Sequence, residues 1–235
     1  MKPTKGMDLA KKITAFCKSA AVALVCTAAL CACSESDDNE NEYSNWRQRN
    51  ESYFSRTMAA AGDSIAAAQA AYADSWQEHS AWRKLLCYSR QNDAMHKTTD
   101  SVAVEILKRG ETPGDTTLSP YFNDRVMIAY RTILMPTTQH PAGLVVDHSG
   151  FSSEYSKVFD RATMSPSTFT VSSLVKGVST SLLYMHKGDR WRVVIPADLA
   201  YGSASQSSIP KYSTIIFEME LVEIYRNGTT PPTWQ

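Results

Sequence analysis

The spacing of apolar residues changes near residue 100, and this change constrains the fold more than any other feature of the chain. Before it, apolar side chains recur at intervals of three and four, which places them on one helical face: Phe54, Met58, Ala61, Ile65, Ala68 and Tyr72. After it, apolar residues alternate with other residues, as they do in β-strands. The sequence therefore predicts a helical segment over residues 45–98, followed by a sheet domain over residues 99–226.

Within the helical segment, Gly62, Asp63 and Ser64 predict a break between two helices, with Asp63 or Ser64 as the second N-cap. Asn92 and Asp93 predict the end of the second helix. Two roles fit such a segment. It is an arm that forms a homodimer through residues 45–92 or cradles client proteins, or its helices pack on the following domain.

The sheet domain is predicted from five alternating stretches, namely residues 102–107, 126–134, 169–171, 191–195 and 215–221. Apolar residues from Val175 to Met185 have helical spacing, and Gly188 follows as the residue after the helix. Arg190 and Arg192 alternate with core residues, so we expect them to lie on a solvated strand face. In the last strand, Glu218 and Glu220 lie on the face opposite the apolar residues. The predicted fold class is α+β, with one twisted antiparallel sheet wrapped on one short central helix.

The first 33 residues are typical of an export signal. Residues 1–19 carry five lysines and a single acid, and the apolar run from Ala20 to Leu30 is too short to span a bilayer. The stretch Leu30-Cys31-Ala32-Cys33 resembles a bacterial lipobox, which implies a lipoprotein signal peptide over residues 1–33 and a lipid on Cys33. Secretion after simple cleavage is the alternative. We expect a protein anchored to the outer membrane of a Gram-negative bacterium, on its periplasmic or cell-surface side.

Residues 34–44 are predicted to form an acidic tether, because five of the nine residues from Ser34 to Glu42 are acidic. After residue 33 the chain has 19 Lys and Arg against 23 Asp and Glu, which argues against nucleic acid as a partner. Cys87 is the one cysteine beyond Cys33, so no intramolecular disulfide is expected. Residues 227–235 are expected to form a disordered tail.

Residues 100–226 resemble the FKBP-type peptidyl-prolyl cis-trans isomerases. The motifs that carry this resemblance, in the family's order, are Lys187-Gly188-Asp189-Arg190, Ile195-Pro196, Leu199-Ala200-Tyr201-Gly202, Ile209-Pro210 and the strand from Ile215 to Leu221. Tyr130 and the segment 143–149 match more loosely. The resemblance implies an FKBP-like fold and a prolyl isomerase that acts on proline-containing unfolded or partly folded proteins.

The resemblance also implies a set of site residues. The catalytic positions are Asp147, Tyr201, Tyr130 and Phe217. The substrate-binding positions are Val146, Leu174, Val175, Val178 and Ile209. In the family, the hydroxyl at Tyr201 and the backbone N–H beside Val175 bind substrate carbonyls, and the carboxylate at Asp147 orients this network.

The sequence departs from the family at several of these positions. Val178 stands where well-studied members have a tryptophan, and Ser167 stands where many have a phenylalanine. A catalytically weak or inactive module for peptide binding or chaperoning is therefore the alternative function. Asp160, which also follows a phenylalanine, is the alternative to Asp147, although Gly143 and Ser149 flank Asp147 at the family's spacing.

The implied reaction requires few catalytic groups. Rotation about an X–Pro amide must overcome a barrier of roughly 18–20 kcal/mol, because the C–N bond has partial double-bond character. No covalent bond is made or broken, so no metal and no cofactor are expected. The twisted amide is less polar than the planar one, so an apolar pocket favours it.

Overall fold

The computed structural model describes residues 42–110, 118–151 and 158–229. The signal peptide and Cys33 lie outside the described residues, as do the tail after Thr229 and the tether before Glu42. No helix in the described ranges is long and apolar enough to cross a membrane.

The chain begins with one long helix, α1, from Trp46 to Tyr72. The break predicted at Gly62 is wrong, because the helix runs through this residue without interruption. Glycine inside a helix costs only about 1 kcal/mol relative to alanine, and burial of Met58 and Ala61 just before it favours a continuous helix. A short turn, Ala73–Ser75, then leads into α2, Trp76–His79.

The second half of the expected helical segment is not helical. Trp82–Leu86 forms strand β1, which pairs antiparallel with β2, Ser101–Lys108. One-turn 3₁₀ helices at Tyr88–Arg90 and Thr98–Asp100 lie between the two strands. The sheet domain therefore begins with β1 and not at residue 99, because pairing with β2 decides the conformation of this stretch.

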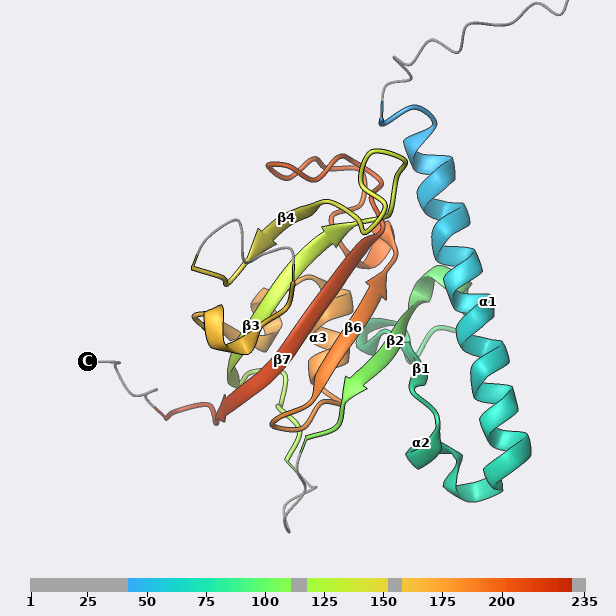
Figure 1. Cartoon of the computed structure of the whole chain (residues 1–235). Helices are drawn as coiled ribbons and strands as arrows, with labels where there is room; N and C mark the ends of the chain where they lie inside the picture. The colour runs from blue at the N-terminus through green and yellow to red at the C-terminus, as the bar shows by residue number, and fades with distance from the viewer. Residues whose placement is uncertain (1–41, 111–117, 152–157, 230–235) are drawn as a thin grey trace, which may run out of the picture. The chain divides into compact units, whose positions relative to one another are not determined.

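The remaining strands are β3, Arg125–Leu134, β4, Val145–His148, β5, Ser167–Thr170, β6, Arg190–Ile195, and β7, Ile215–Tyr225. They form one antiparallel sheet in the order β1-β2-β6-β7-β3-β4, with β5 paired to β3 (Figure 1). One-turn 3₁₀ helices occupy Arg161–Thr163, Val171–Ser173 and Ala197–Leu199. The predicted fold class, an antiparallel sheet on one short central helix, is confirmed.

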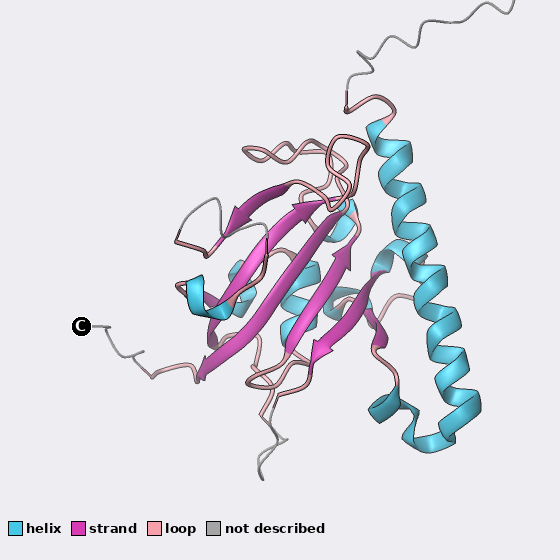
Figure 2. Cartoon of the chain, viewed as in Figure 1, coloured by secondary structure: helices cyan, strands magenta, loops and turns pink. Residues whose placement is uncertain are grey.

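Helix α3, Lys176–Leu182, covers one face of the sheet (Figure 2). Its buried residues Val178 and Leu182 join the main core, together with Val193 and Phe217 from the sheet. Gly177 allows this close approach, because a Cβ at this position would overlap the Ile195 side chain. The short helix thus lies directly against β6.

Helix α1 covers part of the opposite face of the sheet (Figure 1). Phe54, Met58 and Ala61 pack there against sheet residues that include Val194 and Ile216. Two roles were predicted for the helical segment. The buried face of α1 has the second of them, because it packs on the following domain. The C-terminal part of α1 is less buried, and Tyr72, predicted on the apolar face, is exposed.

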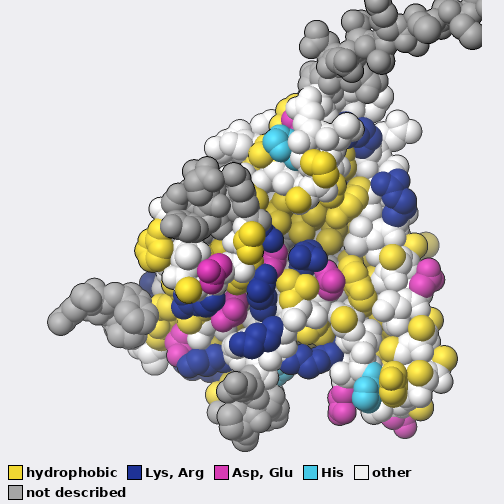
Figure 3. Space-filling model, in the orientation of Figure 1, with side chains coloured by type: hydrophobic (Ala, Val, Ile, Leu, Met, Phe, Trp, Pro, Cys, Tyr) yellow, Lys and Arg dark blue, Asp and Glu magenta, His cyan; other side chains and the backbone are white. Residues whose placement is uncertain are grey.

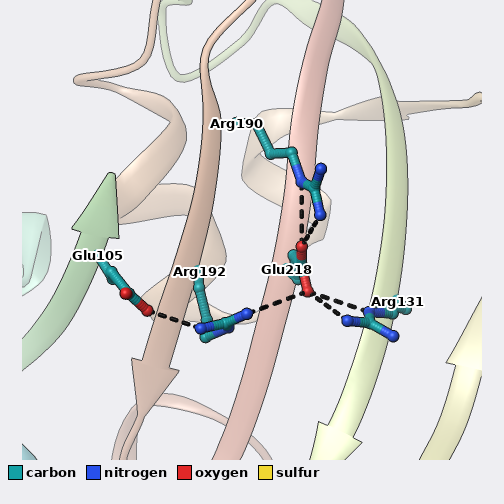
Figure 4. Close-up of polar contacts among 5 residues, drawn as sticks. All are labelled: Glu105, Arg131, Arg190, Arg192 and Glu218. Atoms are coloured by element: carbon teal, nitrogen blue, oxygen red, sulfur yellow. Dashed lines mark hydrogen bonds and ion pairs between the residues drawn. The ribbon is translucent and has the colours of Figure 1, made fainter. Parts of the chain in front are cut away.

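The sheet face predicted to be solvated is instead partly covered. Glu218 on β7 is fully buried and binds Arg131 at 2.7 Å, Arg192 at 3.8 Å, and Arg190 (Figure 4). The Arg190 guanidinium lies 4.0 Å from the centre of the Phe159 ring, so Phe159, in the loop after β4, covers this arginine. Basic side chains gather on this face of the molecule (Figure 3).

Burial alone would raise the pKa of Glu218, but hydrogen bonds and charge from Arg190 and Arg131 outweigh it, so the pKa is lowered. Glu218 is therefore a buried, ionised carboxylate, which is stable only because its arginine partners are in place. Strand periodicity predicted that Glu218 lies on the outer face of β7. It does not predict which loop packs over that face.

Candidate active site

The predicted site residues come from separate parts of the chain and meet beside the main core. Tyr130 lies on β3, Asp147 on β4, Val175 and Val178 at α3, Tyr201 and Ile209 in the loops between β6 and β7, and Phe217 on β7. Every predicted apolar or aromatic residue of the site belongs to the same hydrophobic cluster or packs against it. The structure therefore brings the predicted set together.

An aromatic stack forms one wall of the site. β3 and β7 are antiparallel neighbours in which Thr132 is opposite Phe217, so Tyr130 is a diagonal neighbour of Phe217. Their ring centres are 5.2 Å apart with an angle of 10° between the planes. Phe169 on β5 approaches Tyr130 edge-on, at 5.8 Å.

Phe169 is a site residue that the sequence reasoning missed. Its alternation pattern identified a strand, but the contact depends on β5 pairing with β3, which periodicity does not specify. Phe169 supplies aromatic surface beside Tyr130. Ser167 lies on the same strand, β5, at the position where the resemblance leads one to expect a phenylalanine, and it is opposite Ile128 on β3.

The carboxylate at the site is Asp147. The Tyr130 hydroxyl donates a hydrogen bond to Asp147 Oδ2 at 3.1 Å. The alternative, Asp160, lies at the start of the 3₁₀ turn at Arg161 and accepts a hydrogen bond from the Ala162 N–H. The two candidates therefore have different roles, and only Asp147 contacts a predicted site residue.

Both tyrosines at the site are held in their neutral form. Burial, together with the nearby negative charge of Asp147, raises the pKa of Tyr130 and of Tyr201 above the ordinary value. Each phenol consequently remains a hydrogen-bond donor throughout the neutral range.

Two donors at the site are unused by the described part of the chain. The Tyr201 hydroxyl makes no hydrogen bond there, and neither does the backbone N–H of Val175. These are the donors that the family resemblance assigned to substrate carbonyls. Val178, predicted at the floor of the site, is a core residue that is 1% exposed. The two donors are the groups left to bind a ligand.

A cavity of about 720 Å³ lies elsewhere, between the C-terminal part of α1, α2, β1 and the loop before β6. It contains none of the predicted site residues. Two of its basic side chains have a structural explanation, because Arg83 and Arg109 donate hydrogen bonds to the carbonyls of Gln77 and Ser80 at the end of α2. No group of three or more His, Cys, Asp or Glu side chains suited to a metal ion occurs among the described residues.

One family model matches the part of the chain that carries most of the predicted site residues. Residues 136–222 match the family model for FKBP-type peptidyl-prolyl cis-trans isomerase. This part of the chain is therefore similar to an FKBP-type domain. The matched range includes eight of the nine predicted site residues, from Val146 to Phe217, and leaves out Tyr130.

Several curated proteins are similar to parts of this chain. A macrophage infectivity potentiator from Trypanosoma cruzi is 43% identical over 74 residues, which is 30% of this chain and 38% of that protein. An FKBP-type 22 kDa peptidyl-prolyl cis-trans isomerase from Escherichia coli is 28% identical over 142 residues, 60% of this chain and 58% of that protein. This chain therefore spans less than two thirds of the length of either relative.

Among solved structures, a peptidyl-prolyl cis-trans isomerase from Pseudomonas syringae pv. tomato aligns with a TM-score of 0.42 at 22% identity. The alignment covers 73% of this chain and 96% of that one.

Proposed function

We propose that this FKBP-type domain catalyses cis-trans isomerisation of X–Pro bonds in unfolded or partly folded extracytoplasmic proteins. The observation that carries the proposal is the arrangement around Asp147, where the bonded Tyr130 stacks on Phe217 beside two free donors, the Tyr201 hydroxyl and the Val175 N–H. The proline ring would lie on the apolar surface, and the donors would hold the flanking carbonyls.

The energetic demand on such a site is modest. A thousandfold acceleration requires about 4 kcal/mol of transition-state stabilisation. The planar amide is more polar than the twisted one, so removing it from water onto an apolar surface favours the twisted form. Neutral phenols suit this surface better than phenolates, which would place a negative charge beside substrate carbonyls.

The test is the rate of cis-trans exchange of an X–Pro peptide. Wild-type protein should accelerate exchange, whereas Asp147→Ala and Tyr201→Phe should each reduce kcat/KM by about 10- to 100-fold, because each removes a positioned polar group. Tyr184→Phe is the matched control, since Tyr184 is an exposed tyrosine outside the site. Wild-type acceleration that neither substitution changes would show that the site is elsewhere.

A non-catalytic peptide-binding or chaperone module is the second candidate, and Val178 favours it. This aliphatic side chain gives the floor of the site less aromatic surface than the tryptophan of well-studied members. The two candidates differ in one measurement: a binding module would bind proline-containing peptide, in a manner sensitive to Tyr201→Phe, without accelerating exchange.

We further propose that the mature protein is anchored to the outer membrane through a lipid on Cys33, which the lipobox-like sequence supports. Labelling of cells with a radioactive fatty acid should mark the wild-type protein but not Cys33→Ser. Equal labelling of Cys31→Ser and wild type would show that Cys31 is not the lipidated residue. Loss of label in Cys31→Ser alone would contradict the assignment.

The homodimer predicted through residues 45–92 stays a prediction. The apolar face of α1 is occupied by the sheet of its own chain, so a dimer would use the exposed face and the C-terminal part of this helix.

A further inference from the structure

The first turn of α1 is hydrogen-bonded to a loop more than 160 residues later in the chain. The Trp46 indole N–H donates to Ser213 Oγ at 2.9 Å. The Asn50 side chain accepts a hydrogen bond from the Thr214 N–H at 2.8 Å, and the Thr214 hydroxyl donates to the Asn50 carbonyl at 3.2 Å. All four residues are buried, so these bonds are shielded from competition with water.

The same helical turn also contacts the residue before this pair. The Arg47 guanidinium lies 4.5 Å from the centre of the Tyr212 ring. Tyr212 has a φ of 62°, a left-handed conformation that non-glycine residues rarely adopt. A backbone held in such a conformation needs fixed contacts around it, and α1 provides contacts to this residue and to the next two.

This loop is connected to the candidate active site at both of its ends. The Tyr212 N–H donates to the Gly202 carbonyl at 2.7 Å, directly after Tyr201. Ser213 Oγ donates to the Pro210 carbonyl at 2.6 Å, directly after Ile209. Beyond Thr214 the chain enters β7, which carries Phe217. The loop that is hydrogen-bonded to α1 is therefore linked to three predicted site residues, namely Tyr201, Ile209 and Phe217.

We propose that Trp46 and Asn50 are positioning residues of the active site, through which α1 holds the 209–214 loop in the geometry that binds substrate. This inference rests on the proposed isomerase function. Both side chains are buried, and each acts through the loop that fixes Ile209, Tyr201 and the start of β7. The helical segment is thus a part of the active-site architecture.

The variants are Trp46→Phe and Asn50→Ala. The first keeps an aromatic ring but loses the indole donor, and Ser213 keeps its bond to Pro210. The second removes the acceptor of the Thr214 N–H. Met58→Ala is the matched control, because Met58 is buried on the same helix but packs on the sheet, away from the loop.

We expect each positioning variant to raise KM for an X–Pro peptide by about tenfold with little change in kcat, because the apparent affinity falls with the fraction of loop in the competent geometry. Met58→Ala should lower the stability of the fold and leave KM unchanged. A rise in KM of the same size in all three folded variants would overturn the proposal, since helix stability alone would then explain it.

A second measurement keeps the inference separate from the proposed function. If wild-type protein does not accelerate exchange, the isomerase proposal fails, and amide hydrogen exchange then tests the loop. Exchange of the Tyr212 amide should be at least tenfold faster in Asn50→Ala than in Met58→Ala. Equal exchange rates in the two variants would overturn the positioning role.

Discussion

Tyr130 and Tyr201 are both partly buried, and they share one charged neighbour, the Asp147 carboxylate. Burial and this charge raise both phenol pKa values in the folded protein. In the unfolded chain the same groups ionise near pH 10. Above that pH the unfolded state therefore loses protons that the folded state still holds.

A stability measurement follows from these two tyrosines. Their contribution is fully present below pH 10 and is lost as the pH rises above it, because the folded state resists ionisation. Tyr130→Phe should make the free energy of unfolding fall less steeply between pH 9.5 and 11 than in wild type. Tyr184→Phe is the control, and urea unfolding at each pH provides the measurement. Parallel curves for wild type and Tyr130→Phe would contradict the expectation.

The residues of the site differ in how far the sequence could predict them. Asp147, Tyr201 and Phe217 lie within motifs whose order and spacing identify them. Phe169 lies in no such motif, and its contact with Tyr130 depends on the partner of β5. Glu218 was placed on the correct face, but its partner Arg190 packs against Phe159, a long-range contact that local periodicity does not encode.

At the scale of elements, the Glu218 ion pairs join β3, β6 and β7 through Arg131, Arg190 and Arg192. Glu218→Gln should lower the free energy of unfolding by about 3 kcal/mol, since it leaves three partly buried guanidinium groups without their buried carboxylate. Glu220→Gln, a neighbouring carboxylate that makes no ion pair among the described residues, should have little effect. Urea unfolding at pH 7 gives both values.

The pH dependence of the Glu218 contribution has the opposite direction to that of the tyrosines. Its lowered pKa means that the folded state keeps this carboxylate ionised below its ordinary pKa of 4.5. The stabilisation is present above that pH and is lost on further acidification. The difference in stability between wild type and Glu218→Gln should shrink from pH 5 to pH 3; a constant difference would argue against an ionised Glu218.

Two glycines in helices provide a second test of element packing. Gly177→Ala should destabilise the protein by more than 1 kcal/mol, because the added Cβ overlaps Ile195 and forces α3 away from β6. Gly62→Ala should instead stabilise by up to about 1 kcal/mol, since its Cβ meets only the flexible end of the Lys84 side chain. Thermal unfolding compares the two. The same sign for both would show that helix propensity outweighs packing.

The predicted elements failed where tertiary pairing overrides local preference. The long periodic part of α1 and strands β2, β3, β6 and β7 were predicted from their own sequences. Strand β1 was predicted as helix, because its alternation over Trp82–Leu86 is short and continues an Ala-rich helical stretch. Its conformation is set by the register with β2, in which Leu85 is opposite Val102.

At the scale of the whole molecule, α1 covers a sheet surface that would otherwise be exposed to water. Deletion of residues 42–72 should uncover Ala103, Ile133, Val194 and Ile216, and the truncated protein should aggregate or bind a hydrophobic dye. A truncated domain that stays monomeric and is as stable as the full chain would contradict this expectation. It would instead support the prediction that α1 is an independent arm.

The bond between Trp46 and Ser213 also has a mechanical consequence. Tension applied to the backbone just before α1 would load the first helical turn, and that turn transmits it to the 209–214 loop through Trp46 and Asn50. A pulling force would therefore act on the loop before it acts on the sheet. A molecule held under tension at its N-terminus should therefore bind prolyl peptides differently from the same molecule free in solution.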